Sequence, residues 1–312
     1  MSKTGIIWNE LFTKHSMGLG HPESPSRLLA IKQVLEGDGV GKEVINIKAE
    51  PASIDDLKLI HDESYINLVK QTNGVEFTYL DPDTSACPYT WDAALLAAGS
   101  GITLVKKVAN NDLKNAFAFV RPPGHHAEKN RSMGFCIFNN IAIAAQYAKE
   151  HLGIKRIFIV DFDVHHGNGT QNFFYKNEDV FYFSIHRAPF FPGTGPKNET
   201  GNGKGKGTTL NIPLDHGADD DVYKRALEKH LVPAFESFEP EILLVSAGYD
   251  AHRRDPLGGM RLTNDGFRWI VNTLCELSNE VCNGKQVYML EGGYDLTALR
   301  ECVEISLEEL VL

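Results

Sequence analysis

The 312-residue sequence contains no apolar run approaching the roughly 20 residues that a membrane-spanning helix needs. Its first ten residues lack the charged and then apolar pattern of a secretory signal, so we expect a cytoplasmic protein. The five cysteines are scattered and form no Cys-x-x-Cys pair, which argues against a disulfide framework and a thiolate zinc site. Acidic residues outnumber basic ones by 41 to 31, and the resulting formal net charge of −10 disfavours nonspecific nucleic-acid binding and is compatible with cationic substrates.

A stretch rich in glycine and lysine at residues 201–209 does not fit a phosphate-binding loop. No Gly-x-x-x-x-Gly-Lys-Ser/Thr register matches it, and it precedes a predicted strand instead of following one. We therefore expect a flexible surface turn at these residues.

Short runs of apolar, β-branched and aromatic residues predict the strands of one sheet. The runs lie at residues 6–8, 44–47, 116–120, 156–161, 180–185, 208–212, 242–246 and 286–290. Between them we predict helices at 28–35, 91–108, 140–150 and 219–235, a helix start capped by Ser53, and a polar loop at 81–88. Continuously apolar strands that alternate with helices are typical of a parallel sheet covered on both faces. We therefore expect one α/β domain over residues 1–312, with a mainly parallel sheet of eight strands.

The segment 156–171 starts as a buried strand and then breaks into acids, histidines and glycines. In an extended chain successive side chains alternate faces, so Asp161, Asp163 and His165 would share one side. Two carboxylates and an imidazole form a ligand set for a divalent ion. An acidic strand-to-helix loop, with Asp and His as turn and cap residues, is the plainer alternative.

Polar side chains follow five of the predicted strands at their carboxyl ends. In chain order they are His125 and His126, then Asp161, Asp163 and His165, then His186, then Asp250, and finally Glu291 to Tyr294. Because ligands of open parallel sheets bind outside the carboxyl ends of the strands, this convergence favours a functional site.

Four motifs occur in a fixed order along the chain. They are Arg-Pro-Pro-Gly-His-His-Ala-Glu at 121–128, Asp-Phe-Asp-Val-His-His-Gly-Asn-Gly-Thr-Gln at 161–171, Ser-Ala-Gly-Tyr-Asp at 246–250 followed by Asp-Pro-Leu-Gly-Gly at 255–259, and Leu-Glu-Gly-Gly-Tyr at 290–294. The combination resembles the zinc-dependent histone deacetylase family, closest to its class II type and prokaryotic amidohydrolase relatives. The resemblance implies an arginase/deacetylase-like fold and removal of acetyl or related acyl groups from lysine side chains, with release of acetate.

The resemblance also implies which residues bind ions. Asp163, His165 and Asp250 would hold the metal, in agreement with a site of three protein ligands that leaves positions open for water and substrate. Zinc is the expected ion, and the same ligand types suit Fe²⁺ or Co²⁺. A structural K⁺ would be bound by the side chains of Asp161 and Ser184 and by the carbonyls of Asp163, His165 and Ile185. A second cation site would use carbonyls near Phe174, Asn177 and Val180.

The paired histidines suit proton transfer, because imidazole titrates near neutral pH. Adjacent residues of an extended segment point apart, so His125 and His126 cannot form a metal site by themselves. The resemblance makes His126 the general base and acid, and His125 the stabilising partner of Asp161. Asn168 would orient His126 and should lower its pKa compared with the Asp that class I relatives carry. Tyr294 would donate a hydrogen bond to the oxyanion. The structural alternatives are that the two histidines are capping or core residues and that Tyr294 is a core tyrosine.

The resemblance further implies a substrate tunnel. Gly134, Phe135 and Phe191 match its wall, in which two rings would sandwich an aliphatic chain, unless both rings belong to the core. Asp83 matches a rim residue that binds the substrate backbone, although aspartate is common in loops. Arg27 matches an arginine near an internal acetate channel.

Acetylated polyamines are the alternative substrates. Enzymes that act on them place an acidic gatekeeper after the second metal-binding Asp, where this chain has Leu257, and carry a loop insertion that is missing near residues 15–25. We therefore favour an acetylated lysine peptide or protein over a small acetylated amine. An arginase-like ureohydrolase would need a two-manganese site that Asp250-Ala-His252 does not supply, and a decayed acetyl-lysine-binding scaffold would lack a ligand or catalytic residue.

Overall fold

The structure, a computed structural model, describes residues 3–312. Residues 1–2 lie outside the described residues. The domain predicted over residues 1–312 and the N-terminal segment predicted to lack a signal pattern both include these two residues. An eight-stranded sheet with the order β2-β1-β5-β10-β9-β6-β7-β8 forms the centre, and all seven neighbouring pairs are parallel. Its strands are β1 (Thr4–Ile7), β2 (Val44–Asn46), β5 (Asn115–Ala118), β6 (Ile157–Asp161), β7 (Val180–Arg187), β8 (Thr209–Leu214), β9 (Ile242–Ala247) and β10 (Gln286–Leu290).

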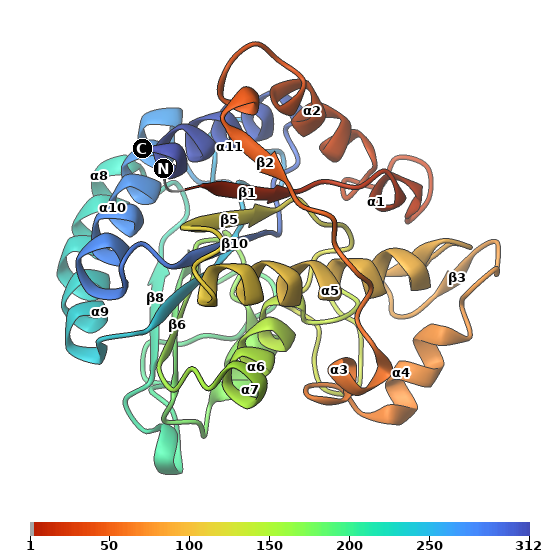
Figure 1. Cartoon of the computed structure of the whole chain (residues 1–312), viewed down its shortest axis with the longest axis horizontal. Coiled ribbons are helices and arrows are strands. Elements are labelled where there is room, and N and C mark those ends of the chain that lie inside the picture. The colour runs from red at the N-terminus through yellow and green to blue at the C-terminus, as the bar shows by residue number, and fades with distance from the viewer. Residues whose placement is uncertain (1–2) are drawn as a thin grey trace.

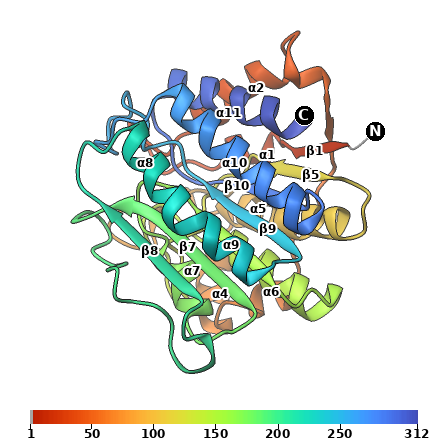
Figure 2. The ribbon, with the colours of Figure 1, turned by 90° about the vertical axis from the view of Figure 1, so that its left-hand side faces the viewer.

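Helices cover both faces of this sheet. In Figure 1, α5, α6 and α7 lie on one side, and Figure 2 shows α8, α9 and α10 in front of the other, with α11 and α2 above them. The helices are α1 (Leu11–Lys14), α2 (Ser26–Leu35), α3 (Ile54–Lys58), α4 (Glu63–Lys70), α5 (Thr90–Ala109), α6 (Asn140–Leu152), α7 (Asn168–Phe174), α8 (Asp220–Ala226), α9 (Val232–Phe238), α10 (Asn264–Cys282) and α11 (Leu296–Val311). The predicted α/β class with helices on both faces is confirmed.

Local sequence accounts for several of these boundaries. Ser53 and Asp56 form a reciprocal capping box at the start of α3, at the residue predicted as its cap. The side chain of Asn139 accepts a hydrogen bond from the Ala142 N–H to start α6, and Gly153 ends that helix with a φ of 71°. The strands β6, β9 and β10 are buried along their whole length, as strands covered on both faces must be.

The predicted strands agree with the observed ones to within two residues at either end. Other expectations were less accurate. The helix predicted at 219–235 is interrupted by a π-helical turn at Leu227–Leu231 and continues to Phe238. The polar loop predicted at 81–88 carries strand β4 (Ser85–Ala86), which pairs with β3 (Thr78–Tyr79) in a small antiparallel hairpin. No helix among the described residues is both long and apolar enough to span a membrane.

A buried ionic cluster connects the N-terminal segment to the loops at the carboxyl edge of the sheet. Glu23 pairs with Arg27 and Arg121, and all three side chains are inaccessible to solvent. Arg27 also donates from Nε to the Gly293 carbonyl at 2.7 Å and from Nη2 to the Glu291 carbonyl. Burial would raise the pKa of Glu23, but Arg121 and Arg27 outweigh it and lower that pKa to about 2.

Substitution Glu23→Gln should therefore leave two buried guanidinium groups without their counter-charge, at a cost of about 3–5 kcal/mol in the free energy of unfolding. Urea denaturation at pH 7 measures this difference. Because the folded pKa is depressed, the stabilisation is complete above the ordinary value of 4.5 and is lost as the pH falls towards 2. Glu36→Gln is the control, because Glu36 pairs with Lys32 at the surface. Equal stability of the two variants would contradict this role of Glu23.

Candidate active site

The loops after β5, β6, β7, β9 and β10 meet at the carboxyl edge of the sheet and enclose a cavity of about 390 Å³. Its lining residues are Asp83, His126, Gly134, Phe135, His165, Phe190, Phe191, Pro256, Leu257 and Tyr294. The residues predicted to form the tunnel, Gly134, Phe135, Phe191 and Asp83, are among them, and so is Leu257 at the position of the gatekeeper. The convergence expected from the strand ends therefore exists in the folded chain.

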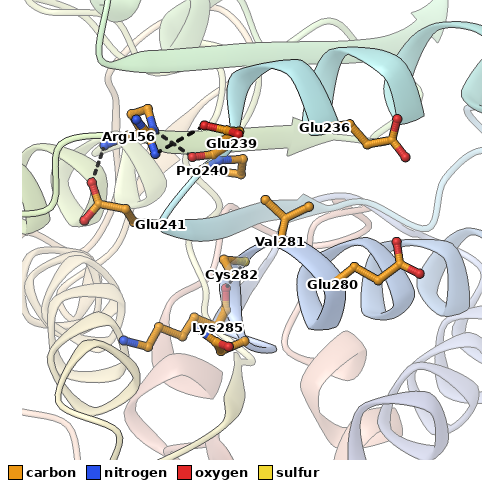
Figure 3. Close-up of a pocket in the computed structure, with 10 residues that line it drawn as sticks. Arg156, Glu236, Glu239, Pro240, Glu241, Glu280, Val281, Cys282 and Lys285 are labelled. Atoms are coloured by element: carbon orange, nitrogen blue, oxygen red, sulfur yellow. Dashed lines mark hydrogen bonds and ion pairs between the residues drawn. The ribbon is translucent and has the colours of Figure 1, made fainter.

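A second cavity, of about 550 Å³, lies at the opposite edge, near the amino ends of β6, β9 and β10 (Figure 3). Arg156 there donates from Nε to the Glu239 carbonyl at 2.7 Å, and Glu241 accepts from the backbone N–H of Arg156. Burial raises the pKa of Cys282 there to about 12, so this thiol is unreactive. Neither an imidazole nor an aromatic ring lines this cavity. The chemically active groups lie at the carboxyl edge.

Asp163, His165 and Asp250 come together at the floor of the first cavity. Their ligand atoms all lie within 4.8 Å of one another, and His165 Nδ1 is 3.0 Å from Asp163 Oδ1 and 3.1 Å from Asp250 Oδ2. Both carboxylates are fully buried. Burial, followed by the charge of Asp163, raises the pKa of Asp250 to about 7. Two crowded carboxylates and an imidazole are a donor set that fits a divalent ion such as Zn²⁺.

Two glycines allow the backbone to approach these carboxylates. A β-carbon at Gly248 would lie 2.1 Å from Asp163 Oδ2, and one at Gly292 would lie 2.1 Å from Asp250 Oδ2. The Gly292 N–H instead donates to Asp163 Oδ2 at 2.8 Å, and the Val164 N–H donates to Asp250 Oδ1 at 2.8 Å. The main chain therefore fixes the direction of both carboxylates.

Asp161 does not join this set, although the alternation of an extended strand placed it on the same side. Its Oδ2 accepts hydrogen bonds from His125 Nδ1 at 3.0 Å and from the Tyr182 hydroxyl at 3.1 Å. Its neighbour across the sheet is Ser184, as the predicted K⁺ site requires, and the Ser184 hydroxyl lies 2.9 Å from His186 Nδ1. In the predicted second cation site, the Phe174 carbonyl accepts from the Asn177 N–H.

His125 and His126 lie side by side, with ring centroids 4.0 Å apart. The expectation that adjacent residues point apart was wrong, because the chain bends here and is not extended. Burial opposes a charge on His125, but Asp161, Asp163 and Glu291 together raise its pKa to about 10. Burial and the neighbouring His125 and His165 hold the pKa of His126 well below its ordinary value. One imidazole is therefore cationic and the other neutral at pH 7.

The tautomer of His126 follows from its partner. Its Nδ1 lies 2.8 Å from Asn168 Oδ1, and since an amide oxygen only accepts, Nδ1 carries the proton. The Asn168 amide nitrogen donates to Glu128 Oε1 at 2.9 Å, which fixes the amide orientation. The unprotonated Nε2 of His126 is thus available as a proton acceptor in the cavity.

Tyr294 also lines the cavity and keeps its phenolic proton, because burial and then Asp250 raise its pKa well above the ordinary value. Its backbone N–H donates to Asp255 Oδ2 at 2.6 Å, and the guanidinium of Arg27 lies 5.2 Å from its ring centroid. Both Arg27 and Asp255 therefore help to hold this loop. The arginine predicted to lie near an internal channel is packed directly against the candidate oxyanion donor.

Aromatic rings line the sides of the cavity. Phe191 stands edge-on to His126, with centroids 5.2 Å apart, and Phe135 stands edge-on to Tyr294 at 6.0 Å. Phe190 stacks on His165 at 5.1 Å, so the wall contains three phenylalanines where the motif indicated two. Asp83 accepts the Gly134 N–H at 3.0 Å, so it also supports the wall loop.

Comparisons with known proteins identify the family. The family model for the histone deacetylase domain matches residues 21–310. The chain belongs to the histone deacetylase family. "Histone deacetylase 10, chloroplastic" from Oryza sativa subsp. japonica is 43% identical over 91% of this chain and 68% of its own. "Histone deacetylase-like amidohydrolase" from Pseudomonas aeruginosa is 35% identical over 93% of this chain and 77% of its own.

A solved structure, "Crystal Structure of HDA15 HD domain", superimposes with a TM-score of 0.95 at 36% identity, covering 100% of this chain and 90% of the other. The expected arginase/deacetylase-like fold is confirmed. Within this histone deacetylase fold, three residues at the site were given no individual role from the sequence: Phe190, and the motif residues Asp255 and Glu291. The available signals were a phenylalanine pair flanked by prolines at 189–192 and an acid before each of two glycine pairs. Glu291 directly precedes Gly292-Gly293, and Asp255 stands three residues before Gly258-Gly259.

Glu291 holds the main chain of the histidine pair. Its Oε2 accepts the N–H groups of Gly124 at 2.7 Å and His125 at 3.2 Å, and its Oε1 accepts the Ser246 hydroxyl at 3.1 Å. With His125 and Cys136 it forms a second group of metal-ligating types, but these hydrogen bonds occupy both of its oxygens. Burial raises the pKa of Glu291 to about 7 and that of the Cys136 thiol well above its ordinary range. This group therefore supports the site through hydrogen bonds.

The hydrogen bonds of Glu291 can be tested with two substitutions. Glu291→Gln retains an oxygen for both N–H groups and should change the free energy of unfolding by less than about 1.5 kcal/mol. Glu291→Ala leaves two buried N–H groups unpaired and should cost about 2–6 kcal/mol, at 1–3 kcal/mol for each. Chemical denaturation of both variants provides the comparison, and an alanine variant as stable as the glutamine variant would refute this support.

Proposed function

We propose that the chain hydrolyses the amide of an acylated lysine side chain, releasing acetate, or a related acid, and the free amine. The proposal rests on one arrangement: the Asp163–His165–Asp250 group lies at the floor of an aromatic-lined cavity, with Nε2 of His126 and the Tyr294 phenol available above it. The family and its amidohydrolase relative support the reaction class.

Asp163, His165 and Asp250 would hold the divalent ion, with Zn²⁺ expected and Fe²⁺ or Co²⁺ also suited to these donors. A bound ion would polarise the acyl carbonyl and lower the pKa of an adjacent water. The protein contributes the orientation of the ligands through the N–H groups of Gly292 and Val164. A K⁺ ion held by Asp161 and Ser184, with the carbonyls of Asp163, His165 and Ile185, remains part of the proposal.

The imidazoles of His125 and His126 have different roles in the reaction. His126 is neutral with a free Nε2, so it takes a proton from the attacking water and later gives it to the leaving amine nitrogen. His125 is cationic beside Asp161, so it stabilises negative charge that develops in the transition state and keeps the pKa of His126 low. The water adds to the carbonyl carbon, the carbon–nitrogen bond breaks, and the proton ends on the amine.

Tyr294 supplies the oxyanion hydrogen bond. Its raised pKa means that the phenol donates throughout the neutral range, and the Phe135 ring restrains it on one side. Phe135, Phe190 and Phe191 exclude water from the acyl-lysine stem, and the apolar Leu257 stands where polyamine enzymes carry an acidic gatekeeper. Asp83, a carboxylate that lines the same cavity, accepts the Gly134 N–H. Leu257 therefore favours acyl-lysine over acetylated polyamines. One domain over residues 1–312 and a cytoplasmic location remain predictions from the sequence.

Turnover of two substrates tests this function. An acetyl-lysine peptide should be hydrolysed with a higher kcat/KM than N-acetylspermidine, and a chelator should abolish both reactions. Tyr294→Phe should lower kcat by about 10²–10³-fold with little change in KM, because the phenol acts on the transition state. A preference for N-acetylspermidine would assign a polyamine substrate, and full activity after exhaustive chelation would refute the metal-dependent mechanism.

The pH dependence of kcat tests the role of His126. In Asn168→Asp, a carboxylate beside Nδ1–H stabilises the imidazolium, so the pKa of His126 rises and the acid limb of the profile moves to higher pH, by roughly 1 unit or more. Glu128 faces the substituted position and would repel the new carboxylate. The double variant with Glu128→Gln should therefore show the larger shift, and Glu128→Gln alone is the control. An acid limb unchanged in the double variant would contradict His126 as the base.

A further inference from the structure

An exposed apolar patch lies beside the mouth of the cavity. It consists of Leu19, which is 108% exposed, Phe77 at 44% and Tyr79 at 71%, and we call these three residues the rim patch. The rings of Phe77 and Tyr79 meet edge to face with centroids 5.0 Å apart, and a β-carbon at Gly18, next to Leu19, would lie 3.6 Å from the Phe77 ring. Apolar side chains gathered in this way on a surface indicate a binding contact more often than isolated ones do.

The rim patch is structurally continuous with the cavity wall. The Ser85 hydroxyl donates to the Met17 carbonyl at 2.9 Å, so the loop carrying Leu19 lies against the β3–β4 hairpin. The turn of that hairpin holds the wall: Asp83 accepts the Gly134 N–H, and the Thr84 hydroxyl accepts the Phe135 N–H at 3.0 Å. His21 packs edge-on against Phe135, with centroids 4.6 Å apart. The loop and the hairpin that carry the rim patch therefore adjoin the cavity wall at Phe135.

The charged residues near the rim patch indicate which kind of molecule would bind there. Residues 15–26 and 71–91 contain no lysine or arginine. They carry Glu76, Asp81 and Asp83 near the patch, while their other glutamate, Glu23, is buried and paired with arginines. An acidic border around aromatic and aliphatic side chains complements a chain that carries both an apolar and a basic side chain. Three side chains are far fewer than the 20–30 residues a side of a stable protein–protein interface, so a second copy of this chain fits poorly.

We propose that the rim patch binds the polypeptide that carries the acyl-lysine, taking an aliphatic or aromatic side chain near the modified lysine while the acidic border takes a basic neighbour. This inference rests on the proposed function and narrows its substrate to an extended peptide segment. A small acetylated amine enters the same cavity without touching the rim patch. The surface therefore contributes to KM and to the choice of peptide, and leaves the chemical step unchanged.

The test compares three substrates. The first is an acetyl-lysine peptide with phenylalanine and lysine within about three residues of the modified lysine, which corresponds to a reach of about 10 Å. The second is the same peptide with both residues replaced by serine, and the third is a small Nε-acetyl-lysine amide. The wild-type chain should favour the first peptide over the second by about fivefold to tenfold in kcat/KM, through KM, as expected for partial burial of one aromatic side chain. The double variant Leu19→Ser/Tyr79→Ser should lose this preference and hydrolyse the small amide within about twofold of wild type.

Leu312→Ser is the matched control, because Leu312 is also an exposed leucine and lies far from β3 (Figure 1). It should retain the peptide preference. Equal kcat/KM for the two peptides in the wild type would overturn the inference. It would also be overturned if the double variant lost as much activity towards the small amide as towards the first peptide. Self-association that the double variant abolishes would assign the patch to a second copy. Hydrolysis of the small amide without any peptide preference leaves the proposed reaction intact, whereas no hydrolysis of any substrate removes both.

Discussion

Two buried carboxylates lie next to one imidazole nitrogen at the floor of the cavity, and the rest of the site is arranged around them. Asp163 and Asp250, whose side chains are inaccessible to solvent, both lie within about 3 Å of His165 Nδ1. Burying like charges this closely is costly, and the raised pKa of Asp250 reflects that cost. A divalent cation between the three groups would remove it, which is why the geometry indicates a metal site.

The same negative charge organises the neighbouring groups. His125 becomes cationic because Asp161, Asp163 and Glu291 surround it, and that cation in turn keeps His126 neutral. The positions of the carboxylates thus determine which of the two imidazoles is charged and which is neutral. The backbone that carries them is held by Glu291, and the loop of Tyr294 is held by Asp255 and by Arg27, whose charge is paired with Glu23.

Much of this arrangement could be predicted from the sequence because it depends on local pattern. Continuously apolar strands indicate a parallel sheet, and motifs at their carboxyl ends must then meet at one edge. The rest depends on contacts between distant segments. Asp161 turns towards His125 and Tyr182 because β6 lies beside β7, and the β3–β4 hairpin forms against a loop 68 residues away, through Ser85 and Met17. The bend that stacks His125 on His126 and the hydrogen bonds of Glu291 likewise have no signature in local periodicity.

The most direct measurement of the central claim is a crystal structure of the protein equilibrated with Zn²⁺, with anomalous scattering recorded on both sides of the zinc absorption edge. We expect one strong anomalous peak in the cavity, at about 2.0–2.2 Å from an oxygen of Asp163, a ring nitrogen of His165 and an oxygen of Asp250. Full occupancy of the ion at any other group, with these three side chains still hydrogen-bonded to one another, would contradict it.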